Sequence, residues 1–191
     1  MQLQRDKSLL LMVDFQAGLL PVIDGGQEAI NEAAWLGEMA CMLKVPVWLT
    51  EQNPEKLGGT APSLMAALND YRLWQKQHFG VMAEAEFESA LKASGKTQIV
   101  LCGTEAHICV LQTGLGLLAA GYELYWLSEA SASRRPQEAT LARERACASG
   151  AVAVTADMVA YEWLHRCDTA QFKEAHQRFL KPRSSRPVRF F

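Results

Sequence analysis

The chain lacks several features that would assign it to a particular compartment. Its first apolar run, Leu9–Val13, has five residues, which is too short for a signal-peptide core or a membrane-spanning helix. No C-x-x-C pair occurs among its cysteines, which are Cys41, Cys102, Cys109, Cys147 and Cys167. We therefore expect reduced thiols and a cytoplasmic protein that does not bind membranes.

Signals for cofactors are missing as well. The four histidines, at positions 78, 107, 165 and 176, show no H-x-x-x-H spacing and no nearby set of carboxylates, so we expect no metal site. No G-x-G-x-x-G follows the first predicted strand and no G-x-x-x-x-G-K-[ST] occurs, which removes the main support for a nucleotide. The net charge of −2 predicts no attraction to nucleic acid.

What is present is a regular alternation of strand-like and helix-like segments. The expected strands are 8–16, 45–52, 72–77, 97–102, 122–128 and 151–156, and the expected helices are 26–44, 61–69, 83–93, 106–120, 137–148, 158–164 and 170–180. Such alternation implies right-handed βαβ crossovers. We predict an α/β fold, a three-layer Rossmann-like doubly wound and mainly parallel sheet of about six strands with helices on both faces.

The length of 191 residues fits one domain, which we place at residues 1–181. Residues 53–63 are rich in turn-forming residues and are expected to be a loop. Residues 182–191 carry three arginines and two prolines. We expect them to form a basic C-terminal tail outside the packed fold.

Polar residues at the ends of the predicted strands are the candidates for chemistry, because ligands of doubly wound sheets lie beyond the carboxyl ends of the strands. Asp14, Lys76 and Cys109 follow or end three of these strands. A thiol becomes a strong nucleophile beside a cation or at a helix N-terminus. A carboxylate can take its proton and return it to a leaving group. We therefore expect Cys109 to be the most alkylation-sensitive thiol.

Each of these residues also has a structural interpretation. Cys109 fits a small buried hydrophobe, Asp14 a loop-capping carboxylate, and Lys76 a solvated strand-end lysine. His107 is an alternative base, although it lies two residues before the cysteine and so faces away from it on a helix.

Four segments in order, LLLMVDFQ, VWLTEQNPEKLGGT, WQKQHFGVM and VLCGTEAHICVLQT, resemble the isochorismatase-like cysteine hydrolases, in particular the branch with a TEQ-x-P-x-x-LG-x-T loop. The resemblance runs from about Ser8 to Phe179. It implies a catalytic triad of Asp14, Lys76 and Cys109. It also implies a cis peptide between Thr104 and Glu105, and an oxyanion hole formed by the backbone N–H groups of Glu105 and Cys109.

Departures from the family narrow the predicted reaction. The nicotinamidase branch binds zinc through histidines in the region that here reads TEQNPEKLGGT, so no metal is carried over. Isochorismatases that cleave a vinyl ether typically lack the cysteine, and Cys109 therefore favours acyl transfer. By motif position, the substrate-binding candidates are Phe15, Gln16, Leu19, Gln52, Leu57 and Phe79.

We predict a cysteine hydrolase that needs no cofactor and cleaves a C–N bond of a small amide-like molecule through a thioester. Two alternatives stay open at this point: a cysteine-independent vinyl-ether hydrolase, and a non-catalytic binding or redox-sensing protein. We also expect a homo-oligomer, with the basic tail either reaching onto a neighbour or untethered.

Overall fold

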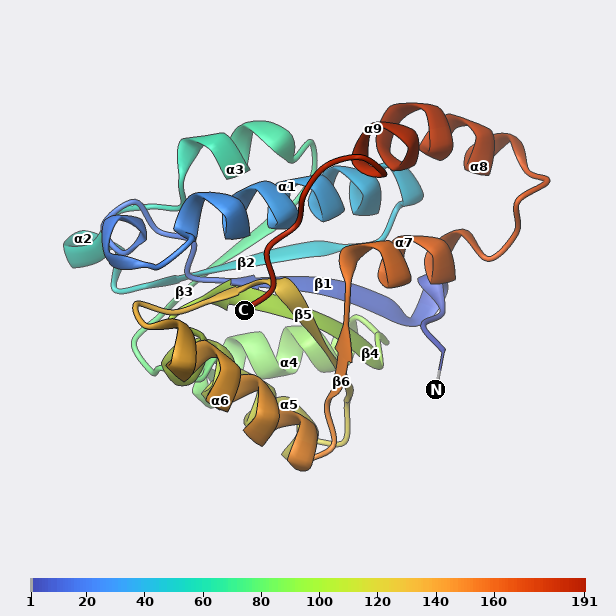
Figure 1. Ribbon diagram of the computed structural model, residues 1–191. Helices are drawn as coiled ribbons and strands as arrows, with labels where there is room; N and C mark the ends of the chain where they lie inside the picture. The colour runs from blue at the N-terminus through green and yellow to red at the C-terminus, as the bar shows by residue number, and fades with distance from the viewer. Residues whose placement is uncertain (1) are drawn as a thin grey trace.

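Six strands form a single parallel sheet in the computed structural model, which describes residues 2–191 (Figure 1). The strand order is β3-β2-β1-β4-β5-β6. The strands are β1 (Ser8–Val13), β2 (Val47–Gln52), β3 (Arg72–Lys76), β4 (Gln98–Thr104), β5 (Glu123–Ala132) and β6 (Val152–Val154). All residues of β1, β2 and β4 are buried, as expected for parallel strands covered on both faces.

Helices cover the two faces of the sheet (Figure 1). One face carries α1 (Gly26–Leu43), α3 (Pro62–Ala67) and α7 (Ala156–Leu164), followed by α8 (Ala170–Ala175) and α9 (Lys181–Arg183). The other carries α4 (Ala85–Ala93), α5 (Leu111–Ala119) and α6 (Pro136–Ala148). Within residues 2–191, no helix combines the length and apolar character that crossing a membrane requires.

The predicted fold class is confirmed, with two differences in local structure. Residues Pro54–Leu57 of the expected loop form the short helix α2, where proline at the first helical turn is favoured because its missing N–H is not needed there. Strand β5 continues past Ser128 to Ala132. Its pairing with β4 shifts register between Leu101 and Gly103, and no hydrophobic pattern marks that irregularity.

Strand order reverses between β1 and β4, which are neighbours in the middle of the sheet. Val13 at the end of β1 pairs with Gly103 of β4. A Cβ atom at Gly103 would lie 2.3 Å from the carbonyl oxygen of Val13, so only glycine allows this approach. The crevice beyond this reversal is where doubly wound folds bind ligands.

The expectation that the C-terminal tail lies outside the packed fold is wrong. Arg183 and Phe191 are only 3% and 5% exposed. The guanidinium of Arg183 forms ion pairs with Glu32 and with Glu129, and the backbone N–H of Phe191 donates to the carbonyl oxygen of Ser128 at 3.1 Å. The sequence showed the cations of the tail, whereas their carboxylate partners are far away along the chain.

Candidate active site

Asp14 occupies the first position after β1, and its carboxylate is completely buried. Its backbone adopts a left-handed conformation with φ of 57°, which aspartate tolerates better than most residues. The hydroxyl of Thr50 donates to Oδ1 at 2.7 Å, and the Asp14 N–H donates to the carbonyl oxygen of Thr50. These two contacts fix the carboxylate against the end of β2.

Lys76 ends β3 and brings a buried cation to this carboxylate. Its Nζ lies 2.7 Å from Asp14 Oδ2, and both side chains have no exposed surface. Nζ also donates to Gln52 Oε1 at 2.6 Å and to the carbonyl oxygen of Phe79 at 3.0 Å. Asp14 Oδ2, by contrast, accepts no hydrogen bond of good geometry even though Nζ is close. One oxygen of the carboxylate thus has capacity to accept a proton.

Cys109 completes the cluster from the far side of the strand reversal. It lies in a π-helical turn, Ala106–Val110, that runs directly into α5. Its side chain contacts both Asp14 and Lys76, and the residue is 5% exposed. The structure therefore brings together all three residues of the predicted triad, while their catalytic roles stay predictions.

The electrostatic state of the thiol differs from the expectation. Burial and, next to it, the negative charge of Asp14 raise the pKa of Cys109 to about 12, although Lys76 acts in the opposite direction. The sequence argument counted the helix start and the cation but not the loss of water around the sulfur. This shift favours the protonated thiol in the resting protein and runs against the activated thiolate expected from the sequence.

The turn between β4 and Cys109 also differs from the expectation. The Thr104–Glu105 peptide is trans, since residues 2–191 contain no cis peptide bond. Glu105 instead adopts a left-handed conformation, with φ of 51° and ψ of 55°, and this redirects the chain. The hydroxyl of Thr104 donates to the carbonyl oxygen of Asp14, which holds the turn against the end of β1.

Three of the predicted substrate-binding residues are buried and engaged within the protein. Phe15 is 1% exposed. The amide of Gln16 donates to the carbonyl oxygens of Gln52 and Gly58 and accepts from the Gln52 N–H. The Gln52 side chain accepts from Lys76 and donates to the carbonyl oxygen of Gln77. These glutamines hold the loop after β2 and the lysine in place.

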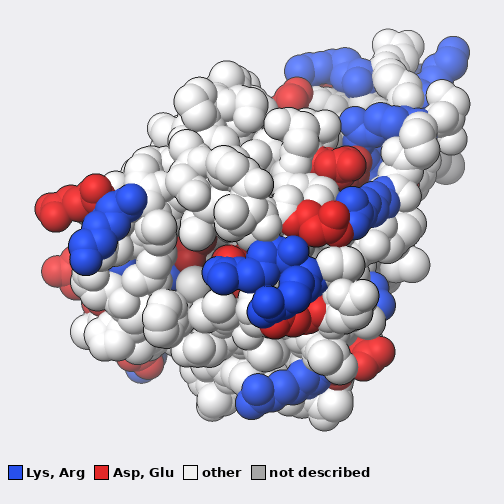
Figure 2. Space-filling model, turned by 60° about the vertical axis from the view of Figure 1, so that its left-hand side comes forward, with Lys and Arg blue, Asp and Glu red and all other residues white. Residues whose placement is uncertain are grey.

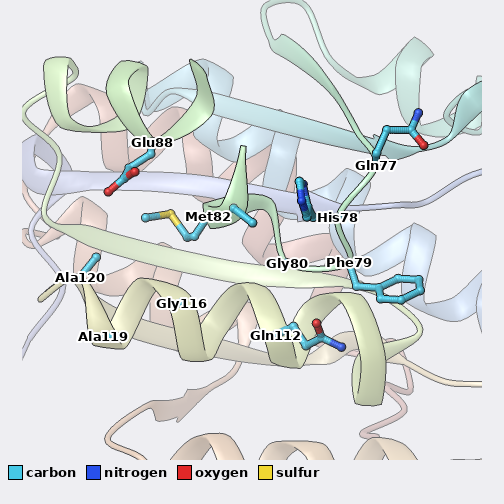
Figure 3. Close-up of a pocket in the computed structure, with 11 residues that line it drawn as sticks. Gln77, His78, Phe79, Gly80, Met82, Glu88, Gln112, Gly116, Ala119 and Ala120 are labelled. Carbon is cyan, nitrogen blue, oxygen red and sulfur yellow. The ribbon is translucent and has the colours of Figure 1, made fainter. Parts of the chain in front are cut away.

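The other three candidates lie closer to solvent. Leu19 and Leu57 are half-buried, and Phe79 is 54% exposed. Phe79 lines a groove of about 740 Å³ between the segment after β3 and α5 (Figure 3). None of the triad residues lines this groove. Substrate binding by any of the six residues stays a prediction.

Sequence reasoning missed a set of hydrogen bonds, from Thr60 to Glu51, that closes the loop after β2. Glu51 Oε1 accepts from the backbone N–H and the hydroxyl of Thr60, at 2.7 and 2.9 Å. Gln16 and Thr60 form an isolated antiparallel bridge. The signal was available in the TEQ and GGT segments of the motif, because a buried glutamate next to a turn needs backbone donors.

A second missed cluster lies beside the π-helical turn. Arg134 donates from Nε and Nη2 to Glu105 Oε1, at 2.8 and 2.5 Å. The two ring nitrogens of His107 lie 3.0 Å from the Ser133 hydroxyl and 3.3 Å from Glu138 Oε2. His107 therefore faces the start of α6, which favours the structural interpretation over a general-base role.

The described residues also bear on metal and nucleic-acid binding. Residues 2–191 contain no group of three or more histidine, cysteine, aspartate or glutamate side chains arranged to hold a metal ion. Basic and acidic side chains lie next to each other on the face seen in Figure 2, without a continuous basic surface. The absence of a metal, a cofactor and a nucleic-acid partner stays a prediction.

Comparison with known proteins assigns the chain to a family. The isochorismatase domain model matches residues 8–158. Isochorismatase domain-containing protein 2 of Xenopus laevis is 31% identical over 175 residues, which cover 92% of this chain and 84% of that protein. The chain belongs to the isochorismatase family of hydrolases.

Solved structures share its fold. MAR1 ribonuclease from Caenorhabditis elegans superposes with a TM-score of 0.89 at 29% identity, covering 98% of this chain and 95% of that chain. YcaC from Escherichia coli, described as an octameric hydrolase of unknown specificity, gives a TM-score of 0.85 at 24% identity, covering 95% and 92%. The resemblance to the family is confirmed, and the assignment to the TEQ-loop branch stays a prediction.

Proposed function

We propose that this protein is a cysteine hydrolase that cleaves the C–N bond of a small, uncharged amide through a thioester. The observation that carries the proposal is the arrangement around Asp14. Its buried Oδ2 lies 2.7 Å from Lys76 Nζ, accepts no hydrogen bond of good geometry, and belongs to a side chain in contact with the Cys109 thiol. A base, a cation and a nucleophile therefore share one dry site.

In the first step, the sulfur of Cys109 attacks the amide carbonyl carbon while Asp14 takes the thiol proton. Because the thiol is protonated at rest, this transfer has to accompany the attack, and the fixed carboxylate makes it possible. The carbonyl π electrons move to oxygen, and the backbone N–H groups of Glu105 and Cys109 stabilise the resulting oxyanion.

In the second step, the tetrahedral intermediate collapses and the C–N bond breaks. Asp14 returns its proton to the leaving nitrogen, which departs as ammonia or an amine and leaves an acyl group on sulfur. Water then attacks the thioester with Asp14 as base, and the products are a carboxylic acid and the regenerated thiol. Lys76 keeps a positive charge beside Asp14 throughout, so the site never carries an isolated buried anion.

Ribonuclease activity is the second candidate, since the C. elegans neighbour is named as a ribonuclease. The buried triad argues for a small substrate, because Asp14 and Lys76 have no exposed side-chain surface and Cys109 is 5% exposed. A polynucleotide backbone is bulky and needs an open, basic groove.

We also propose that the protein works as a homo-oligomer. The octameric state described for the E. coli neighbour supports this proposal. Light scattering of the full chain at micromolar concentration tests it, and a monomer across that range contradicts it.

A substrate screen tests the proposed reaction. Purified protein is incubated with a panel of small aliphatic and aromatic primary amides, and ammonia release is measured. Intact mass spectrometry during turnover should show an acyl adduct that maps to Cys109. A single-stranded RNA is included as a separate arm.

The matched control is Cys109→Ala, with Cys102→Ala as a variant of a buried cysteine outside the triad. Turnover and adduct should disappear in the first and persist in the second. Near-normal amide hydrolysis in Cys109→Ala contradicts the thioester mechanism, and RNA cleavage without amide hydrolysis favours the ribonuclease.

A further inference from the structure

Glu105 adopts a backbone conformation that glutamate does not favour. The left-handed region suits glycine and asparagine, and the chain instead has a glutamate there, with φ of 51°. Its side chain is 4% exposed, so contact with water does not explain a glutamate here. The buried carboxylate therefore needs partners within the protein.

Arg134 holds that carboxylate. Nε and Nη2 both donate to Glu105 Oε1, at 2.8 and 2.5 Å. The hydrogen bond to Glu105, followed by its charge, raises the pKa of Arg134, so the guanidinium stays ionised. Paired donors from one planar group fix direction as well as distance.

The clamp joins two separate parts of the chain. Glu105 directly follows β4, and Arg134 lies two residues before the first residue of α6. His107, two residues further along the turn, is also held by this segment, because its backbone N–H donates to the Ser133 hydroxyl at 3.3 Å. The turn that leads from β4 to Cys109 is thus anchored from outside by the residues before α6.

We propose that Arg134 and the Glu105 side chain are positioning residues for the oxyanion hole, and that they act by holding the left-handed turn in the conformation that aims its backbone N–H groups at the substrate carbonyl. This inference rests on the proposed function, in which those N–H groups bind the oxyanion. A hydrogen-bond donor stabilises developing charge only when it is already in place, which requires a turn that does not move.

Two probes of Cys109 separate this role from general effects on folding. Acetaldehyde adds to a thiol: the S–C bond forms, the carbonyl π bond breaks, and the thiol proton ends on the oxygen of the thiohemiacetal. This adduct places an oxygen in the oxyanion hole. Iodoacetamide also forms an S–C bond but expels iodide and leaves no oxyanion, so it reports access and ionisation of the sulfur alone.

The experiment titrates [1-¹³C]acetaldehyde by NMR and measures the rate of Cys109 alkylation by peptide mass mapping. Arg134→Met should weaken the aldehyde adduct by about ten- to a hundredfold, less than the ~10²–10³ expected for outright loss of a donor. Alkylation should change by less than about threefold, because the thiol environment is kept. Arg134→Lys should recover part of the adduct affinity. Arg135→Gln, which removes the neighbouring arginine, should change neither.

The double variant Glu105→Gln with Arg134→Met decides between positioning and charge. If Arg134 served only to neutralise a buried carboxylate, removing both charges would restore the adduct, and the proposal would be wrong. Positioning predicts that the adduct stays weak. An unchanged adduct in Arg134→Met overturns the clamp while leaving the proposed function intact. If the wild-type protein forms no acetaldehyde adduct beyond what Cys109→Ala also forms, both the clamp and the proposed function are overturned.

Discussion

The triad and the tail cluster, defined as Arg183 with Glu32, Glu129 and Asp157, both contain buried ion pairs, which join Lys76 to Asp14 in the first and Arg183 to Glu32 and Glu129 in the second. Every nitrogen of the Arg183 fork donates to one of its three carboxylates. At the triad, one oxygen of Asp14 accepts no hydrogen bond and its side chain contacts a thiol. A cation whose three nitrogens each have a carboxylate partner can hold a fold closed, whereas a carboxylate oxygen that accepts no hydrogen bond can take up a proton.

The two regions also differ in which group suffers most from burial. Burial raises the pKa of Glu129, and Arg183 lowers it again only in part. At the triad the group with the raised pKa is the thiol of Cys109. Burial therefore works against charge in both places, but only at the triad does the affected group have a base beside it.

Asp14→Asn changes the triad and should give the largest effect, a loss of turnover. Turnover on an amide found by the screen should fall by roughly 10²–10⁴, because proton transfer has no base, while the protein stays folded. Asp157→Asn is the matched control from the tail cluster, where the side chain is 52% exposed, and should keep its turnover. Equal losses of turnover in the two variants, measured by steady-state kinetics, would contradict a catalytic role for the triad and a structural role for the tail cluster.

Arg183→Met should show the reverse pattern. It leaves the buried carboxylate of Glu129 without its cation, while Glu32 keeps Arg186, and should lower the free energy of unfolding by roughly 3–5 kcal/mol, as measured by urea denaturation. Turnover per folded molecule should not change. Arg178→Met, which removes an exposed pair with Glu174, should cost less than about 0.5 kcal/mol.

The stability loss in Arg183→Met should depend on pH. Glu129 already has a raised pKa in the folded state because of burial, and losing Arg183 raises it further. A group with a raised folded-state pKa stabilises the protein at low pH and loses that contribution as the pH rises through its folded-state pKa. The deficit should therefore be smaller under mildly acidic conditions than at pH 7, and a deficit that grows on acidification contradicts this account.

Phe191→Ala also changes the docked tail and should lower the free energy of unfolding by less than Arg183→Met does. The ring is 5% exposed, and its removal should cost roughly 1.5–3 kcal/mol of unfolding free energy. Phe190, which is 56% exposed, provides the matched control, since Phe190→Ala removes an aromatic ring that is mostly in water. Similar melting temperatures for the two variants would mean that the end of the chain is not docked in solution.

The smallest expected effect concerns thiol reactivity. With its pKa raised to about 12, Cys109 should react with iodoacetamide at pH 7.5 at least about tenfold more slowly than the exposed Cys167, because the thiolate is the reacting species. The Cys109 rate should keep rising with pH above 9. Peptide mapping after timed exposure gives both rates, and a faster Cys109 would restore the activated thiolate expected from the sequence.

The sequence predicts what depends on local pattern and on motif residues. The alternation of apolar runs and helical spacing is sufficient for the parallel sheet, and the motifs lead to Asp14, Lys76 and Cys109. The turn at Glu105 was out of reach, because a left-handed conformation is uncommon for glutamate and the partner of its side chain, Arg134, lies 29 residues further along the chain. The docked tail was missed for a related reason, since Arg183 reads as a solvated cation until Glu32 and Glu129 are seen beside it.

The pairing of β1 with β4 has a consequence for how the molecule assembles. These neighbouring strands pair Ser8 with Gln98, and Asp14 and Cys109 are 95 residues apart (109 − 14). Contacts this distant along the chain form late, since closing a long loop costs entropy before any contact forms. Helices can therefore form early in refolding while the protein is still inactive. The rate at which turnover recovers then reports the rate at which β1 and β4 pair.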